Sequence, residues 1–207
     1  MARCTWSPNL DDVPADALAP VAETIVSTRT FVKDWTFSEV MSDGEPNAKG
    51  RSFDRGKSLF TDVACIKCHR LGCDGPEVGP DLKGLQEKLT RKEIQRIDIL
   101  REMIEPSAKI DPKYQTWIVT DNDGHVLSGI IAERTDQSIR LLTNPLDGSE
   151  PVTVAVDQIE DQQESKISIM PQGLLNTLSK DEILDLLWYV ESCGDPAHAI
   201  YQTAEQK

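Results

Sequence analysis

Two thiols and an imidazole follow one another closely in the string Cys65-Ile66-Lys67-Cys68-His69. Thiols separated by two residues can each add to one vinyl group of a haem, and a histidine directly after them is placed to ligate the iron. This spacing is therefore typical of c-type haem attachment. A thioredoxin-like redox pair belongs near a βαβ unit, and a zinc site usually takes ligands from a second paired cluster; the sequence shows neither. We predict one covalent haem c, bound through Cys65, Cys68 and His69.

The iron needs a second axial ligand, and Met170 is the best candidate. It lies in the loop string Ser168-Ile169-Met170-Pro171, where a methionine has no helical face to fill. Met103, in contrast, fits the apolar face of a helix, as a methionine in a protein core ordinarily does. A thioether ligand favours ferrous iron and raises the reduction potential. His125 and His198 are rivals in principle, although the first follows a turn and the second lies in the C-terminal tail.

A stiff segment, Gly79-Pro80-Asp81-Leu82, follows the cysteine cluster. A ligating histidine generally donates its other ring N–H to a carbonyl or carboxylate, which fixes the orientation of the ring. The backbone carbonyl of Pro80 could accept that bond from His69. The alternative is an ordinary turn, because the string alone has low specificity.

Three helices are expected around these residues, one before the cysteines and two after them. Ser52 can cap the first, which runs towards Val63. Thr90 and Glu93 form a capping box for the second, and Ser179 begins a similar box for the third. Gly194 is typical of a helix stop. The expected apolar faces are Leu59 and Phe60 in the first helix, Ile94, Ile97, Leu100, Met103 and Ile104 in the second, and Ile183, Leu187 and Val190 in the third.

Between the second and third helices the apolar residues change to an alternating pattern. Gln115 to Thr120 alternates, Asn122-Asp123-Gly124 is typical of a hairpin turn, and His125 to Glu133 returns. Ser138 to Thr143 and Val152 to Val156 are further short strands. About five short strands in this segment indicate a small closed barrel, since closure removes exposed sheet edges.

The first fifty residues have a mixed character. Asp11 to Pro20 is rich in Asp, Ala and Pro, as linkers often are, and Val21 to Val40 could form one helix against the main body. Met1 to Asp12 lacks the basic and apolar regions of a signal peptide. We therefore expect either a mature form or an excised fragment.

Composition narrows the classes of partner. The formal net charge of −13 argues against nucleic acid, whose phosphates need a basic surface. An acidic surface suits a basic partner protein, or it simply keeps the protein in solution. No apolar run approaches the length of a transmembrane helix. The five cysteines are an odd count, so at most two of the three outside the haem motif can pair within the chain.

The motifs follow one another in a recognisable order. They are Gly56, Leu59-Phe60, Cys65 to His69, Gly79 to Leu82, Met170-Pro171 and Leu186 to Tyr189, accompanied by Asp34-Trp35-Thr36, Gly50 to Gly56, Glu105-Pro106-Ser107, Asp123-Gly124, Ser165 to Leu175 and Gly194-Asp195. This order resembles the class I cytochrome c family. More narrowly, it is similar to the haem-binding domain at the C-termini of large planctomycete and verrucomicrobial proteins, which often follows a propeller-type dehydrogenase-like module.

The resemblance implies that His69 and Met170 are the axial ligands and that a β insertion separates the helices. It also implies a close approach between the first and last helices at Gly56, near Trp188. The insertion additionally resembles an SH3-like or Sm-like barrel. The sequence departs from the family at two cysteines, Cys73 and Cys193, which could form a disulfide in an oxidising periplasm.

The expected fold class is mainly α, a cytochrome c fold with an inserted small β-barrel. We expect an N-terminal linker and helical arm over residues 1–50. The cytochrome c domain is expected in two parts, residues 51–108 and 166–207, with the barrel between them at residues 109–165. The expected function is one-electron transfer in the periplasm, as the electron-accepting domain of a larger dehydrogenase-like protein. No catalytic group is evident, so an enzyme is not expected. A redox partner protein or a fused dehydrogenase domain would exchange the electron. The alternatives are a haem-based small-ligand sensor and an interaction module that docks through the insert.

Overall fold

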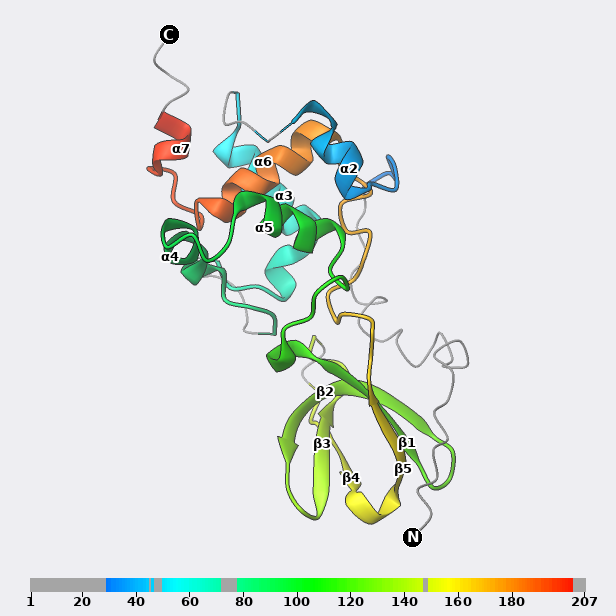
Figure 1. Ribbon diagram of the computed structural model, residues 1–207. Coiled ribbons are helices and arrows are strands. Elements are labelled where there is room, and N and C mark those ends of the chain that lie inside the picture. Colours follow the sequence, from blue (N-terminus) through cyan, green and yellow to red (C-terminus); the bar gives the residue numbers. More distant parts are fainter. Residues whose placement is uncertain (1–28, 45, 47–49, 72–77, 147–148, 203–207) are drawn as a thin grey trace. The chain divides into compact units, whose positions relative to one another are not determined.

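The computed structural model describes residues 29–44, 46, 50–71, 78–146 and 149–202 (Figure 1). These residues form two compact units. The helical unit consists of residues 29–109 and 170–202, and the β unit consists of residues 110–169. The chain is mixed α/β, so the expectation of a mainly α fold is wrong: the alternating segments pair into a five-stranded sheet.

The helical unit is built from short helices joined by turns. No helix of the described residues is long and apolar enough to cross a lipid bilayer. The α-helices are α2 (Phe37–Val40), α3 (Phe53–Asp62), α4 (Leu85–Thr90), α5 (Arg96–Ile104), α6 (Lys180–Glu191) and α7 (Ala199–Gln202), and the 3₁₀-helices are η3 (Met41–Asp43), η4 (Cys65–Lys67) and η5 (Leu82–Gly84).

Helix α3 begins and ends as predicted. The side-chain oxygen of Ser52 accepts the backbone N–H of Arg55 at 3.2 Å, which satisfies one free donor of the first turn. Leu59 and Phe60 are buried, and Val63 follows the last residue of the helix. The capping residue and the apolar face of α3 were therefore predicted correctly from the sequence.

Helix α6 also confirms its predicted signals. The carboxylate of Glu182 accepts the backbone N–H of Ser179 at 2.8 Å, while the Ser179 hydroxyl oxygen accepts the N–H of Glu182 at 3.4 Å. Gly194 has a left-handed φ of +73° after the last turn, and its N–H donates to the carbonyl of Tyr189 at 3.2 Å. The predicted capping box and helix stop are both confirmed.

The segment between the cysteine cluster and α5 differs from expectation. Thr90, predicted to begin a helix, ends α4, and its hydroxyl donates to the carbonyl of Gln86 at 2.8 Å rather than capping a following turn. Lys92 then adopts a left-handed φ of +59°, which breaks the helical path. The carboxylate of Asp98 accepts the N–H of Gln95 at 2.7 Å, so the capping box of α5 lies further along the chain.

The N-terminal arm is not one helix. Residues 21–28 of the predicted helix lie outside the described part of the chain, and residues 29–36 are not helical. The backbone N–H groups of Val32 and Lys33 both donate to the carbonyl of Asn176, so they cannot make helical bonds. Thr36 and Glu39 form a capping box that starts α2 only at Phe37.

Helices α3 and α6 cross at Gly56 (Figure 1). A Cβ at this position would lie 2.5 Å from the carbonyl oxygen of Asp185 and 2.6 Å from the Cβ of Tyr189. Only glycine lets the two backbones come this close. The implied approach at Gly56 is confirmed, although the residues it meets are Asp185 and Tyr189 rather than Trp188.

A fully buried carboxylate lies at the same crossing. Asp185 has an exposed fraction of 0%, and its Oδ1 accepts the backbone N–H of Ser52 at 3.2 Å. The guanidinium of Arg55 donates to Oδ2, and that of Arg51 lies 3.5 Å from Oδ1. A buried charge is tolerated only when it is paired and hydrogen-bonded. Asp185 therefore ties the beginning of α3 to the middle of α6.

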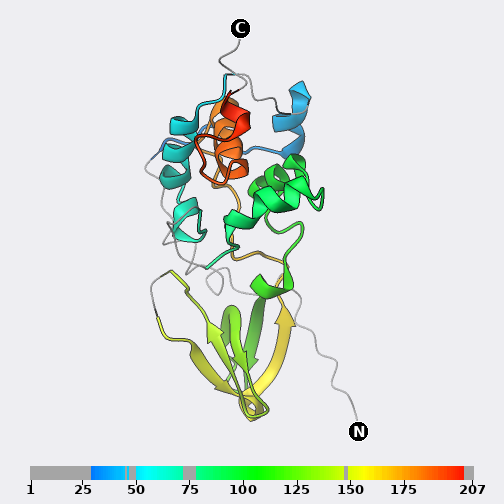
Figure 2. The same cartoon turned by 90° about the vertical axis from the view of Figure 1, so that its left-hand side faces the viewer.

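The β unit is an antiparallel sheet with the strand order β4-β3-β2-β1-β5 (Figure 2). Its core contains Val119, Ile139, Leu141 and Val154, all buried. The predicted turn is confirmed, because Gly124 has a φ of +82° and donates to the carbonyl of Asp121 at 2.9 Å. The strands are β1 (Thr116–Asp121), β2 (Val126–Arg134), β3 (Ser138–Leu142), β4 (Val152–Ala155) and β5 (Ile159–Glu164), with the 3₁₀-helices η6 (Pro112–Tyr114) and η7 (Val156–Gln158).

The sheet is not closed into a barrel, so that prediction is wrong. Strands β4 and β5 are its two edges and pair only with β3 and β1. The short helix η7 joins them, and its ends bond to hairpin turns: Val156 N–H donates to the carbonyl of Gln137 at 2.8 Å, and Asn122 N–H donates to that of Gln158 at 2.9 Å. These turns, rather than a β4–β5 ladder, fix the connection.

The close approach at Gly56 predicts a specific cost for an added methyl group. Gly56→Ala should lower the free energy of unfolding by about 1–3 kcal/mol, because the helices must move apart. Gly84→Ala is the matched control, since a Cβ there meets nothing within 4 Å. Urea unfolding of both variants measures the effect. Equal midpoints would contradict the tight crossing.

Candidate functional site

The cysteine cluster lies directly after α3. Ala64 has a left-handed φ of +63°, which turns the chain out of the helix and into η4. The N–H groups of Cys68 and His69 both donate to the carbonyl of Cys65, at 3.2 and 3.0 Å. The end of α3 and this single turn of backbone therefore hold the two cysteines and the histidine together.

The two thiols have apolar surroundings. Both are free and partly buried, and burial raises the pKa of Cys65 to about 12 and raises that of Cys68 as well. In a thioredoxin-type pair the pKa of the reactive thiol is shifted in the opposite direction, below its ordinary value. The environment of these two thiols therefore differs from that of a thiolate redox pair.

The imidazole of His69 is held by the stiff segment after the cluster. Its Nδ1 lies 3.0 Å from the carbonyl oxygen of Pro80. Burial lowers the pKa of His69, opposed by the bond to Pro80. Because a carbonyl oxygen can only accept, the hydrogen of this bond is on Nδ1, which is the Nδ1–H tautomer in a neutral ring. In that tautomer the lone pair of Nε2 is left for a metal.

Gly79 is a further part of the site, which the sequence reasoning did not single out. A Cβ at Gly79 would lie 3.0 Å from Cε1 and 3.2 Å from Nδ1 of His69. Its N–H donates to the carbonyl of Cys68 at 2.7 Å. The missing side chain thus makes the cradle in which the imidazole lies. The available signal in the sequence was the glycine directly before Pro80, although the sequence alone could not show that this glycine contacts His69.

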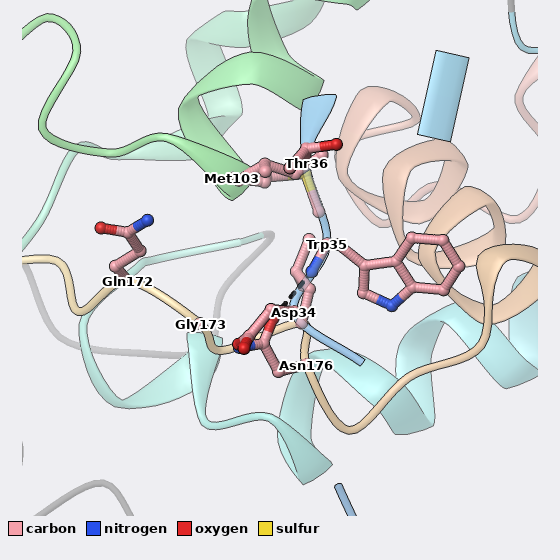
Figure 3. Close-up of a pocket in the computed structure, with 9 residues that line it drawn as sticks. Asp34, Trp35, Thr36, Met103, Gln172, Gly173 and Asn176 are labelled. Carbon is pink, nitrogen blue, oxygen red and sulfur yellow. Dashed lines mark hydrogen bonds between the residues drawn. The ribbon is translucent and has the colours of Figure 1, made fainter. Parts of the chain in front are cut away.

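Met170 lies on a different loop of the helical unit, just before α6, and is partly buried. The structure thus brings Cys65, Cys68, His69 and Pro80 together, and Met170 belongs to the segment 170–179 that leads into α6. Met103 lines a cavity of about 350 Å³ beside that loop (Figure 3).

The two rival histidines are engaged elsewhere. His125 is exposed in the β unit, and its Nδ1 lies 2.9 Å from the carboxylate of Asp121, which raises the pKa of His125. His198 accepts the backbone N–H of Ile200 through Nδ1 at 3.3 Å. Each ring is therefore held through Nδ1 within its own local turn, and His125 lies in the β unit rather than the helical unit.

A second buried charge lies at the other end of α6. The guanidinium of Arg96, from α5, pairs with the carboxylate of Glu191 and lies 3.7 Å from the ring centroid of Trp188. Trp188 itself is 1% exposed. This cation–π and ion-pair contact joins α5 to α6. The sequence reasoning missed it, as it missed Asp185, although charged residues within the apolar stretch of α6 were the available signal.

The predicted disulfide lies partly outside the described residues. Cys73 belongs to residues 72–77, which the structure does not describe. Cys193 is a free thiol whose Sγ lies 3.3 Å from the carbonyl oxygen of Leu82. The pairing therefore stays a prediction.

The residues of the site fit a covalent haem. Two free thiols stand at the spacing that thioether formation needs, and the imidazole beside them has its Nδ1 side held by Pro80. The cradle at Gly79 leaves the ring no freedom to turn towards that segment. The donor set and its orientation are those of a c-type attachment site.

Comparison with known proteins agrees with this chemistry. Residues 53–124 match the family model described as Cytochrome c. The match begins at α3, includes the cysteine cluster, α4 and α5, and extends into the β unit over η6 and β1. A search of curated proteins finds no match to the chain. The cytochrome c family implies haem-based electron transfer, and its members are typically electron carriers rather than enzymes. Residues 53–124 are therefore a cytochrome c domain.

Proposed function

We propose that this chain transfers single electrons through one haem c, attached by Cys65 and Cys68, with His69 and Met170 as the axial iron ligands. The observation that carries the proposal is the compact turn in which both thiols lie beside an imidazole fixed by the Pro80 carbonyl. The haem, when bound, supplies an iron that alternates between the ferrous and ferric states.

The residues of the chain have separate tasks in this proposal. Each thiol adds its sulfur and its hydrogen across one vinyl group, so no oxidant is needed and the cofactor cannot dissociate. The bond from His69 to Pro80 keeps Nε2 directed for ligation and makes the imidazole a stronger donor. Met170 supplies a thioether that favours ferrous iron, which raises the reduction potential.

The wider context is also proposed. The resemblance to planctomycete and verrucomicrobial C-terminal domains supports a place in a larger periplasmic dehydrogenase-like protein, from which the haem accepts electrons. The net charge of −13 supports a redox partner with a basic surface. The division at residues 110 and 169 supports an insert between two parts of one cytochrome c domain.

Replacing the proposed sixth ligand tests the function directly. Met170→Leu keeps the volume of the side chain but removes the sulfur. We expect the ferric protein to lose its weak long-wavelength methionine–iron band and the potential to fall by on the order of 100 mV, because the axial ligand sets the potential. Absorption spectra and a redox titration measure both.

Met103→Leu is the matched control, since Met103 lies in the same unit but packs against the helical core from α5. Its spectrum and potential should equal those of the unaltered protein. An unchanged band in Met170→Leu would move the sixth ligand to another residue. Ready binding of carbon monoxide by the unaltered ferrous protein would favour a small-ligand sensor instead.

The attachment chemistry makes an independent prediction. Cys68→Ala should leave one vinyl group intact, so the reduced pyridine complex of the haem should absorb at a longer wavelength than that of the unaltered protein. Cys193→Ala, the control, should keep the spectrum of two thioether bonds, because Cys193 contacts the carbonyl of Leu82. Identical spectra for both variants would contradict attachment through Cys68.

A further inference from the structure

The arm formed by residues 29–36 is bonded to the loop that follows Met170. The N–H groups of Val32 and Lys33 donate to the carbonyl of Asn176 at 2.7 and 3.0 Å. The indole N–H of Trp35 donates to the carbonyl of Leu178 at 2.8 Å. The arm therefore follows this loop through several backbone bonds.

The side chain of Asn176 is the centre of this contact. Its Oδ1 accepts the backbone N–H of Trp35 at 3.3 Å, and its Nδ2 donates to a carboxylate oxygen of Asp34 at 2.5 Å. Figure 3 shows the side chains of Asp34 and Asn176 facing each other beside Gly173. Asn176 thus makes hydrogen bonds to the same arm through its backbone carbonyl, its side-chain oxygen and its side-chain nitrogen.

Asn176 also connects the arm to the earlier part of this loop, because its backbone N–H donates to the carbonyl of Gly173 at 2.9 Å. Leu175 and Leu178 are buried in the helical core and anchor its later part. The earlier part, at Gln172 and Gly173, borders the cavity of about 350 Å³. Gly173 has a left-handed φ of +83°, and a Cβ there would lie 2.9 Å from Nδ2 of Asn176, so the two residues are in close contact.

We propose that Asn176 is a positioning residue for the sixth iron ligand. The arm, through Asn176 and its bond to Gly173, restrains the loop that leads from Met170 to α6, and this restraint would keep Met170 on the iron. The inference rests on the proposed function, because it takes Met170 to be the axial ligand. Neither the arm nor Asn176 needs to touch the haem.

A substitution of Asn176 tests this role in the complete, haem-loaded protein. Asn176→Asp keeps the size and the acceptor for the Trp35 N–H but places a second carboxylate against Asp34. We expect a weaker methionine–iron band in the ferric state and roughly tenfold tighter binding of carbon monoxide to the ferrous state, the change that losing one or two hydrogen bonds gives.

The reciprocal variant separates positioning from general damage. The double variant Asp34→Asn, Asn176→Asp again places one side-chain amide opposite one carboxylate. The methionine–iron band and the weak binding of carbon monoxide should therefore return. Lys33→Ala is the control on the same arm, because it removes the exposed ion pair with Glu39 but keeps the backbone N–H to Asn176. Its band should be unchanged.

The outcomes distinguish the two proposals. An unaltered protein without the methionine–iron band would overturn the ligation by Met170 itself. A normal band in the unaltered protein and in Asn176→Asp alike would overturn only the positioning role. Failure of the reciprocal variant to recover the band would also overturn it, since the paired contact would then not be what holds the loop.

Discussion

The contact between α3 and α6 at Gly56 is the constraint on which the site depends. Because a Cβ there would overlap Asp185 and Tyr189, the two helices meet backbone to backbone. The C-terminal end of α3 leads into the cysteines, and the N-terminal end of α6 follows the loop of Met170. Fixing this one crossing therefore fixes the elements that present both candidate ligands. The paired carboxylate of Asp185 reinforces it at the start of α3.

The two candidate ligands are held by different physical means. His69 is positioned locally, by Gly79 and Pro80, which lie close to it in the sequence. Met170 belongs to a loop whose restraint comes from Asn176 and an arm far away along the chain. A local restraint survives changes elsewhere in the fold, whereas a distant one depends on the docking of a second segment. The proposed sixth ligand, Met170, is thus the part of the site that a distant segment of the chain restrains.

Local signals in the sequence were sufficient for features whose cause is local. The cap at Ser52, the box at Ser179 and the stop at Gly194 depend only on near neighbours, and all three are present. The start of α5 was misplaced because Thr90 has two possible partners, and the backbone carbonyl of Gln86 competes for its hydroxyl. Barrel closure and the bonds of Asn176 depend on segments far apart in the sequence, so no local pattern could predict them.

The most direct test of haem-based electron transfer is the absorption spectrum of the unaltered protein made with the c-type maturation machinery, recorded oxidised and reduced. We expect covalently bound haem, sharp low-spin bands on reduction and a weak methionine–iron band on oxidation. Protein that matures without any covalent haem would contradict the assignment of Cys65, Cys68 and His69.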